Sequence, residues 1–591
     1  MRVAELLLIS GVAYFNTFSV PFMFDDKPAI TGNPSIRQWT TVLNPPDIGS
    51  GVTGRPLVNL SLALNHAVSG EAVWSYHALN LLIHAGAGLA LFGIVRRTLS
   101  RPVFGERLRN AAEPLAFAIA ALWLAHPLQT ESVTSIIQRT ESLVGLFYLL
   151  TLYGFVRSLD ASPRARLWGA GSVAACLLGM AAKEVMVTAP LLLLLYDRTF
   201  AAGSLREALR LRGRYYLALA CTWLLLGWLV LSGGGTRGEA AGFGLGVTPW
   251  MYALTQCRAV LLYLQLSLWP HPLVFDYGSD IVRQPGEVWW QIIALAGLLG
   301  AAAYAWWRRL PSGFLGAWFF LILAPSSSVV PLVSQTIAEH RMYLPLAAVI
   351  ALVVVWVYAW LGRAALYAAY VLVPVAVLLT VQRNLDYRTE EILWADTVAK
   401  APDNSRARIN LAEVLINDGR PAEALEHAAA AVRLRPDHAE AQTNLGIACA
   451  QLGRPAEALA ACGKAVELRP DYARGRSNYG IVLAQSGRWN EAITQFEAAL
   501  RLAGDAPDAV RIRGNLARAL LRANRWDEAV TQFSAVLKAE PGAADMHYNL
   551  ALALGLSGRD DEAIAELQTA LQLDPGHAGA RAALEAARGI R

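Results

Sequence analysis

Long apolar runs in the first two thirds of the chain constrain its fold more than any other feature. Residues 1–382 contain many such runs, whereas residues 383–591 are rich in Ala, Arg, Glu and Asp and contain few. A helix needs ~20 mostly apolar residues to cross a membrane. The sequence therefore predicts an all-α protein, in which a polytopic membrane domain at 1–382 precedes a water-exposed helical domain.

Eleven apolar segments, several of them short, are predicted to span the membrane. They lie near 3–22, 73–95, 113–126, 139–156, 167–182, 184–197, 214–232, 287–307, 313–332, 342–361 and 365–382. The stretch 250–269 is also long enough, but counting it as a crossing would place Arg308 and Arg309 outside. We therefore predict that 250–269 forms a helix at the membrane interface.

Arginines gather in alternate loops and set the orientation, because basic loops remain in the cytoplasm. They flank the second span and follow the fourth, sixth and eighth spans: Arg96, Arg97, Arg101, Arg107, Arg109, Arg157, Arg164, Arg166, Arg198, Arg206, Arg210, Arg212, Arg214, Arg308 and Arg309. This places the N-terminus inside and, after eleven crossings, everything beyond 382 outside. The loop after the first span, the segments 126–139, 233–286 and 333–343, and the C-terminal domain then share the outer side.

A motif of the form GRPAEA repeats through the C-terminal domain. Its copies start at 419, 453, 487, 524 and 558, and are spaced by 34, 34, 37 and 34 residues. A 34-residue period with a closing proline, as at Pro436 and Pro470, is typical of tetratricopeptide repeats, which stack into an α-solenoid. We predict a half-repeat connector at 383–404, five repeats at 405–577 and a capping helix at 578–591. The concave face of such an array binds peptides or proteins, or the array holds oligomers together.

Several short motifs fall on the predicted outer side. They are FMFDD at 22–26, GRP at 54–56, AHPLQTESVTSIIQRTESL at 125–143, AAKEVMVTAPLLLLLYD at 181–197 and AEHRMYLP at 338–345. Taken in this order and followed by the repeats, they resemble the transmembrane and tetratricopeptide-containing O-mannosyltransferases. More distantly, they resemble the protein O-mannosyltransferases and other integral-membrane glycosyltransferases of the GT-C class.

This resemblance implies an inverting transfer of a sugar, mannose in the family, from a polyprenyl-phosphate donor to an acceptor hydroxyl. A carboxylate then acts as general base. Asp25 and Asp26 are the candidates for that base, and we favour Asp26 because Asp25 lies nearer the apolar run. Alternatively, the pair has a turn or capping role.

The leaving phosphate needs a cation, and arginine suits planar contact with phosphate. The resemblance offers Arg55, Arg139 and Arg341, each of which has an alternative role as an interfacial anchor. In animal members, an acidic residue and an arginine stand three residues before the Tyr of the last motif. Here His340 occupies the place of that arginine, so His340 is a fourth candidate ligand of the phosphate.

Four further residues are candidates for substrate contact: His126, Glu131, Lys183 and Glu184. His126 and Glu131 could instead shape their loop, and Lys183 and Glu184 could pair with each other. The spacing of His66, His77 and His84 indicates one helix face, so we predict no catalytic metal.

The resemblance implies no cofactor beyond the lipid-linked sugar, which is the donor substrate. It implies a protein Ser or Thr acceptor selected by the repeats, and the composition gives no reason to expect nucleic acid binding. The richness in Ala and Arg suggests a bacterial inner membrane with a periplasmic outer side. Two other functions stay open: a membrane-anchored tetratricopeptide scaffold without catalysis, and a transporter of lipid-linked sugars.

Overall fold

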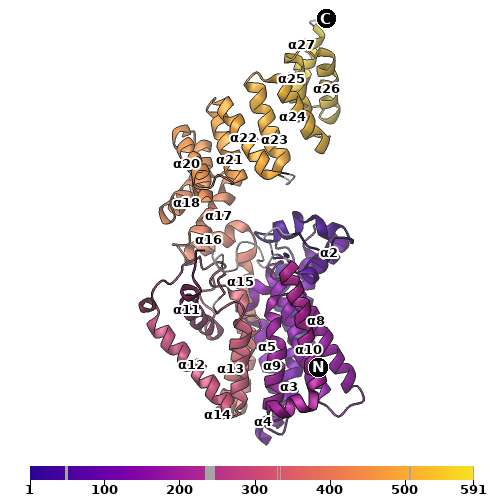
Figure 1. Ribbon diagram of the computed structural model, residues 1–591, viewed down its shortest axis with the longest axis vertical. Helices are drawn as coiled ribbons and strands as arrows, with labels where there is room; N and C mark the ends of the chain where they lie inside the picture. The colour runs from indigo at the N-terminus through magenta and orange to yellow at the C-terminus, as the bar shows by residue number, and fades with distance from the viewer. Residues whose placement is uncertain (47–50, 233–245, 329, 333–334, 505–507, 590–591) are drawn as a thin grey trace. The chain divides into compact units, whose positions relative to one another are not determined.

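The computed structural model describes residues 1–591 except 47–50, 233–245, 329, 333–334, 505–507 and 590–591 (Figure 1). The chain forms two compact units, Met1–Pro402 and Asp403–Arg591. Within the described residues, the regular elements are helices and none is a β-strand. The predicted all-α fold is therefore confirmed. Part of the predicted outer loop 233–286, namely 233–245, lies outside the described residues.

The first unit is a bundle of α-helices. These are α1 (Arg2–Tyr14), α2 (Pro56–Ser69), α3 (Trp74–Leu99), α4 (Glu106–Asn110), α5 (Ala112–Ala125), α6 (Thr130–Thr134), α7 (Arg139–Ser158), α8 (Ala165–Met180), α9 (Ala189–Phe200), α10 (Leu205–Ser232), α11 (Pro249–Leu268), α12 (Trp289–Trp307), α13 (Pro311–Leu323), α14 (Pro345–Leu361), α15 (Arg363–Asn384) and α16 (Glu390–Lys400). Each of the eleven predicted spans overlaps one of these helices.

Short 3₁₀ and π turns join these helices. They are η1 (Phe15–Thr17), η2 (Lys27–Thr31), η3 (Pro34–Arg37), η4 (Pro127–Gln129), η5 (Glu184–Thr188), η6 (Pro285–Glu287), η7 (Glu339–Met342) and η8 (Leu385–Tyr387). The predicted connector 383–404 begins within α15, and its η8 and α16 belong to the first unit, which extends to Pro402.

Four helices in the described residues, α3, α10, α12 and α15, are long and apolar enough to cross a membrane. In α12 only 6% of the apolar window is buried, and Trp289 and Trp307 at its two ends are 62% and 69% exposed. Tryptophans at both ends of an exposed apolar helix are typical of the two membrane interfaces. The chain is therefore a membrane protein, and the remaining crossings stay predictions.

The centre of the first unit is built by α5 and α7. Trp123 of α5 is fully buried, and its Nε1 donates to the Tyr343 carbonyl at 2.9 Å. A Cβ on Gly145 of α7 would lie 2.4 Å from the Tyr343 ring, so only glycine leaves room for that ring. These contacts fix the backbone that follows η7, where one of the predicted motifs lies.

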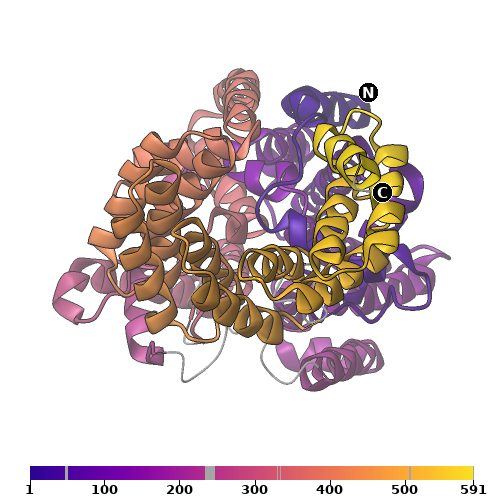
Figure 2. The same cartoon turned by 90° about the horizontal axis from the view of Figure 1, so that it is seen from above.

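The second unit consists of paired helices that follow a curved path (Figure 2). They are α17 (Ser405–Asn417), α18 (Pro421–Leu434), α19 (Ala439–Gln451), α20 (Pro455–Leu468), α21 (Ala473–Gln485), α22 (Trp489–Ala503), α23 (Asp508–Arg522), α24 (Trp526–Ala539), α25 (Ala544–Leu556), α26 (Asp560–Leu573) and α27 (Ala578–Gly589). The longer spacing of 37 residues falls between α22 and α23, where residues 505–507 lie outside the described residues.

The repeated motif marks the turn inside each helical pair. Its first residue has positive φ in every repeat: Gly419, Gly453, Gly487, Asn524 and Gly558. Glycine and asparagine are the residues that adopt this left-handed conformation most readily at a helix end. The single departure from glycine in the repeat is thus the substitution that the turn tolerates best.

Candidate functional site

The predicted outer motifs meet at the end of the first unit where α2 and α16 lie, whereas α4 lies at the opposite end (Figure 1). Asp26 accepts the N–H of Ile137, and Phe24 donates its N–H to Glu390 at 2.8 Å. These two bonds bring together segments that are 111 and 366 residues apart.

The two carboxylates of the FDD motif have different surroundings. Asp26 is 2% exposed; its Oδ1 accepts the Ile137 N–H at 2.7 Å, and its Oδ2 accepts the Met23 N–H at 3.1 Å. Burial raises the pKa of Asp26 to about 7. Both oxygens bind backbone groups, as in the turn role that the sequence left open.

Asp25 is half-buried and lines a small cavity with Ser135, Gln138 and Gln335. The cavity has about 10 Å³ for the centre of a water-sized sphere, which is room for about one water molecule. A carboxylate on a cavity wall can meet a hydroxyl there, whereas the enclosed carboxylate of Asp26 cannot. The geometry therefore favours Asp25 as the candidate base, whereas the sequence analysis favoured Asp26.

The backbone of the motif has an uncommon conformation. Phe24 has a φ of 44°, a left-handed value that is rare outside glycine. Its N–H donates to Glu390, and its ring packs edge-on against Trp394 with centroids 5.3 Å apart. Glu390 also pairs with Lys27 at 2.7 Å. Helix α16 thus holds the loop that carries Asp25.

Arg139 lies away from the cavity. Its guanidinium is fully buried and donates to Asn80 Oδ1 at 2.6 Å, to Asn65 Oδ1 at 2.7 Å and to the Tyr76 carbonyl at 2.8 Å. A further bond reaches Ser61 Oγ at 3.2 Å. Because these acceptors take up its N–H groups, Arg139 joins α2, α3 and α7, and the geometry argues against its predicted role as a phosphate ligand.

Glu131 and His340 form a buried pair between α6 and η7. His340 Nδ1 lies 2.7 Å from Glu131 Oε1, and the His340 N–H donates to Glu131 Oε2 at 3.1 Å. The other ring nitrogen, Nε2, lies 3.8 Å from Glu141 Oε1. Glu131 therefore orients His340 rather than facing an open space.

Arg341 lies beside the Asp25 cavity. Its guanidinium donates to the Thr336 carbonyl at 3.0 Å and also to the carbonyl of Gln335, the residue that lines the cavity with Asp25. Arg341 also lines a second cavity, with Glu141 and Leu344. Gln335 thus links the cavity of the candidate base to this candidate cation.

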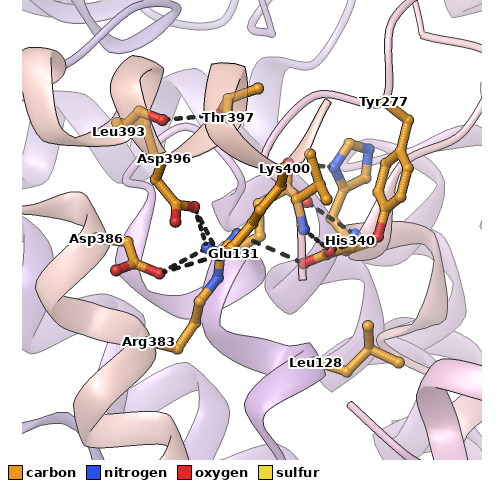
Figure 3. A network of polar contacts seen from close by, with 12 residues as sticks. Leu128, Glu131, Tyr277, His340, Arg383, Asp386, Leu393, Asp396, Thr397 and Lys400 are labelled. Atoms are coloured by element: carbon orange, nitrogen blue, oxygen red, sulfur yellow. Dashed lines mark hydrogen bonds and ion pairs between the residues drawn. The ribbon is translucent and has the colours of Figure 1, made fainter. Parts of the chain in front are cut away.

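A second charged network borders the same region (Figure 3). Arg383 pairs with Asp386 at 2.7 Å and Asp396 at 3.1 Å, and its Nη2 lies 3.9 Å from Glu339 Oε2. Lys400 also pairs with Asp396 at 2.7 Å. The network connects α15 and α16 to η7.

Glu339 is the buried acid of this network. Its Oε1 accepts the Val274 N–H at 2.6 Å and the Tyr277 hydroxyl at 2.8 Å. Burial raises the pKa of Glu339 to about 7. The predicted outer loop 233–286 is thereby attached to η7 through its described part.

Lys183 and Glu184 each have an ion-pair partner on another segment of the chain. Lys183 Nζ pairs with Glu141, and Glu184 lies 3.7 Å from Arg55 Nη2. Arg55 also donates to the Gly51 carbonyl at 2.8 Å. These four charged residues, Arg55, Glu141, Lys183 and Glu184, therefore form one cluster near the ends of α2, α7 and α8. The cluster reaches His340 through Glu141.

His126 stabilises a turn. It is buried, its Nδ1 accepts the Leu128 N–H at 3.2 Å, and its Nε2 lies 3.2 Å from the Ser267 carbonyl. Both nitrogens thus contact backbone groups, in agreement with the loop-shaping alternative. His77 and His84 likewise contact the backbone carbonyls of Val20 and Leu124. Among the described residues, no group of three or more His, Cys, Asp or Glu side chains is arranged to hold a metal.

An apolar cavity of about 320 Å³ lies among α3, α9, α13 and α14. Trp318 and Ala347 line it. About one helical turn farther along, Ile322 on α13 and Leu344, which directly precedes α14, line the second cavity with Glu141 and Arg341. The two spaces thus follow one another along α13 and α14, from apolar walls toward a charged end.

Sequence reasoning missed three residues that contribute to this site: Glu141, Arg383 and Gln335. Glu141 lies two residues after Arg139 inside a quoted motif, so a charge-pairing search over that motif could have found it. Arg383 follows directly on the last predicted span, where a basic residue looks like an interfacial anchor. Gln335 carries no signal in the sequence.

Comparisons with known protein families identify the repeats of the second unit. A family model described as "Tetratricopeptide repeat" matches residues 393–436, 409–473 and 515–578, and a second of the same description matches 471–539. The predicted repeats are therefore confirmed. A solved structure titled YrrB, a TPR protein with an unusual peptide-binding site, is 22% identical and covers 32% of this chain and 97% of that chain, with a TM-score of 0.29.

The names of several relatives of this chain state one activity. Protein O-mannosyl-transferase Tmtc2 of Drosophila melanogaster is 28% identical over 334 residues, which are 52% of this chain and 34% of that protein. Protein O-mannosyl-transferase TMTC2 of Homo sapiens is 33% identical over 214 residues, 33% of this chain and 24% of that protein. This chain is a homologue of the protein O-mannosyl-transferases.

A third homologue extends the matched region. Protein O-mannosyl-transferase F38B6.6 of Caenorhabditis elegans is 23% identical over 460 residues, which are 73% of this chain and 62% of that protein. The resemblance to the transmembrane and tetratricopeptide-containing O-mannosyltransferases is thus confirmed as homology. The chain spans about a third or less of the length of the Drosophila and human relatives.

Proposed function

We propose that this chain is an integral-membrane glycosyltransferase that moves a sugar, mannose by homology, from a polyprenyl phosphate to a protein Ser or Thr hydroxyl. The observation that carries the proposal is that Gln335 lines the cavity of Asp25 and its carbonyl accepts a hydrogen bond from Arg341. A base and a nearby cation are what a displacement on a glycosyl phosphate requires. The activity stated in the names of the homologues supports the reaction class.

In the proposed reaction, the acceptor oxygen attacks the anomeric carbon of the donor. The new glycosidic bond forms as the bond between that carbon and the phosphate oxygen breaks, so the configuration inverts. The hydroxyl proton passes to the Asp25 carboxylate, which acts as general base. Asp26 keeps the loop in place through Met23 and Ile137.

The leaving group is polyprenyl phosphate, which gains negative charge as the bond breaks. Arg341 is the proposed partner for that charge, because a preorganised cation in a site shielded from water stabilises a developing anion strongly. Lys183 and Arg55 lie in the cluster that reaches His340 through Glu141, and they add positive potential nearby. The lipid-linked sugar is a substrate, so the proposal includes no cofactor and no metal.

The apolar cavity along α13 and α14 supports a lipid-linked donor. Its walls are apolar side chains, and the next cavity along the same helices contains Arg341. A prenyl chain suits the first space, and Arg341 in the wall of the second is the proposed partner of the phosphate. A nucleotide sugar would have no use for the apolar space.

The tetratricopeptide array is the proposed acceptor-recognition domain. Stacked repeats present an extended concave surface that binds peptides and proteins. Eleven crossings from an inner N-terminus would put the outer loops of the first unit and the array on the same extracytoplasmic side, which is periplasmic in a bacterial cell.

The test is transfer by the purified full chain from polyprenyl-phosphate mannose to a Ser/Thr-rich peptide, followed by mass spectrometry of the peptide. Glycosylated peptide together with released polyprenyl phosphate supports the enzyme. Movement of the donor across a vesicle bilayer without product would instead support a transporter. Absence of both transfer and movement would support a scaffold without catalysis. Arg341→Gln should weaken donor binding, whereas Arg37→Gln, an exposed arginine paired with Glu71, should not.

A further inference from the structure

A further cavity of the first unit lies at the opposite end of α7 from the candidate site. It has a volume of about 1030 Å³ and lies between α8 and the start of α10, beside Ser158 at the end of α7. Four arginines line it: Arg166, Arg210, Arg212 and Arg214. Gly169 and Ala170 on α8 keep the space open because they have little or no side chain.

A local break in α10 arranges these arginines. Arg212 has non-helical backbone angles, φ −131° and ψ 25°, inside the helix. Its Nη1 donates to both oxygens of buried Asp197 at 2.9 and 3.0 Å, and the Tyr216 hydroxyl donates to the same carboxylate at 2.8 Å. Asp197 on α9 thus fixes the break, so that residues on both sides of it line the cavity.

Two of the four positive charges have no counter-charge nearby. Arg212 is paired with Asp197, and Arg210 is paired with Glu207 at 2.7 Å. Arg166 and Arg214 are exposed, and within the described parts of the chain their side chains have no ion-pair or hydrogen-bond partner. The cavity therefore carries a net positive charge that is open to an anionic ligand.

The cavity lies at a membrane boundary. Helix α10 is one of the four helices that are long and apolar enough to span, and its arginines all lie in its first ten residues. Helix α7 has 20 residues from Arg139 to Ser158, so its ends are about 30 Å apart at 1.5 Å per residue. That distance matches the hydrocarbon thickness of a bilayer, so the cavity faces the leaflet opposite the candidate site.

An apolar surface continues from the cavity along α10. Leu217, Leu224 and Leu231 are 67%, 74% and 80% exposed, and their spacing of seven places them on one helix face. A free anion would use only the arginines, whereas a lipid would use the arginines and this face. Basic pockets between membrane helices are known to bind anionic lipid headgroups.

We propose that the cavity lined by Arg166, Arg210, Arg212 and Arg214 binds the headgroup phosphate of an anionic phospholipid whose acyl chains lie along the exposed leucine face of α10. The site is independent of the sugar-transfer proposal. It would anchor the break in α10 to one leaflet and favour membranes rich in anionic lipid.

The test uses the purified full chain in a neutral detergent and counts bound lipids by native mass spectrometry. The probes are phosphatidylglycerol, phosphatidylcholine with the same acyl chains, and inorganic phosphate. The wild type should bind phosphatidylglycerol about tenfold more tightly than phosphatidylcholine, because each arginine near an anionic headgroup adds to the binding free energy. The double variant Arg166→Gln/Arg214→Gln should lose about tenfold in affinity for phosphatidylglycerol, and Arg166→Lys/Arg214→Lys should retain most of it.

The matched control is Arg164→Gln/Arg206→Gln. Both of these arginines are exposed and adjacent in sequence to the cavity, but neither lines it. The control should bind phosphatidylglycerol as the wild type does. Equal binding of the two lipids by the wild type, an equal loss in the control, or displacement of the lipid by inorganic phosphate at the same concentration would overturn the proposal.

Discussion

Asp26 Oδ1 accepts the backbone N–H of Ile137 at 2.7 Å, across 111 residues of sequence. The bond ties the loop after the first helices to the connection between α6 and α7, and both segments line the cavity that contains Asp25. One acid of the FDD motif therefore holds the site together, and its neighbour is left facing the space where a hydroxyl could react.

Replacing Asp26 with Asn should destabilise the first unit. The amide of Asn can accept only on its oxygen, so either the Met23 or the Ile137 N–H would face an NH₂ group. Leaving one buried donor unsatisfied costs about 1–3 kcal/mol. Chemical denaturation of the purified wild type and Asp26→Asn should reveal this loss, and an unchanged midpoint would contradict the structural role.

The same variant should change the pH dependence of stability. Burial raises the pKa of Asp26 to about 7, above the value of about 3.9 for an unfolded Asp, so the folded state holds this proton more tightly. Its contribution is full below about pH 4 and is lost as the pH rises through 7. Between pH 5 and 8 the wild type should therefore lose more thermal stability than Asp26→Asn. Parallel curves for the two proteins would argue against the raised pKa.

Arg139→Met should reduce the yield of folded protein without a specific effect on the donor. The change removes a buried guanidinium and leaves the acceptors on Asn65 and Asn80 unpaired, at about 1–3 kcal/mol each. Size-exclusion profiles and thermal unfolding should show the damage, and the folded fraction should bind polyprenyl phosphate as the wild type does. A stable variant that binds the donor weakly would restore Arg139 to the phosphate site.

Two truncations should separate the array from the helix that supports the site. A chain ending at Pro402 keeps α16, with Glu390 and Trp394 against Phe24, and should hydrolyse the donor or transfer to a small acceptor. A chain ending at Tyr387 lacks α16 and should lose that activity. Loss of donor binding in both chains would show that the array itself is required for the chemistry.

The sequence predicted the class of the fold well because its signals are strong and repeated. Apolar runs mark the helices of the first unit, and the recurring turn at Gly419 and its equivalents marks the second. Boundaries were harder to predict: α16 resembles the first half of a repeat in sequence, yet it packs in the first unit through Trp394, and no local pattern announces that contact.

The candidate site was predicted as a set of motifs but not as a geometry. Glu131, His340, Lys183 and Arg55 do belong to connected clusters, as the spacing of motifs on one side of the membrane suggested. The neutral side chains around Arg139 could not be predicted, because a lone arginine in a motif carries no sign of its neighbours. Which of Asp25 and Asp26 is the candidate base depends on which carboxylate accepts the backbone N–H of Ile137. Only the folded chain contains that information.

The orientation of the chain is open to a direct test. The eleven crossings predicted from the sequence, counted from an inner N-terminus, would place the C-terminus outside the cytoplasm. An alkaline phosphatase fused after Arg591 should therefore be active, and a reporter that requires the cytosol should be silent at the same position. The opposite pattern would place the array in the cytoplasm and contradict its proposed role in binding an extracytoplasmic acceptor.

The most direct test of the central claim is the rate of sugar transfer by Asp25→Asn, measured with polyprenyl-phosphate mannose, a Ser/Thr peptide and the purified full chain. Asn keeps the size of the side chain but cannot take the proton, so the rate should fall by about 10²–10⁴-fold while donor affinity and folding stay near those of the wild type. Asp26→Asn, scaled to its folded fraction, should lose far less. Near-wild-type turnover by Asp25→Asn would contradict the account and leave the FDD motif as a structural turn.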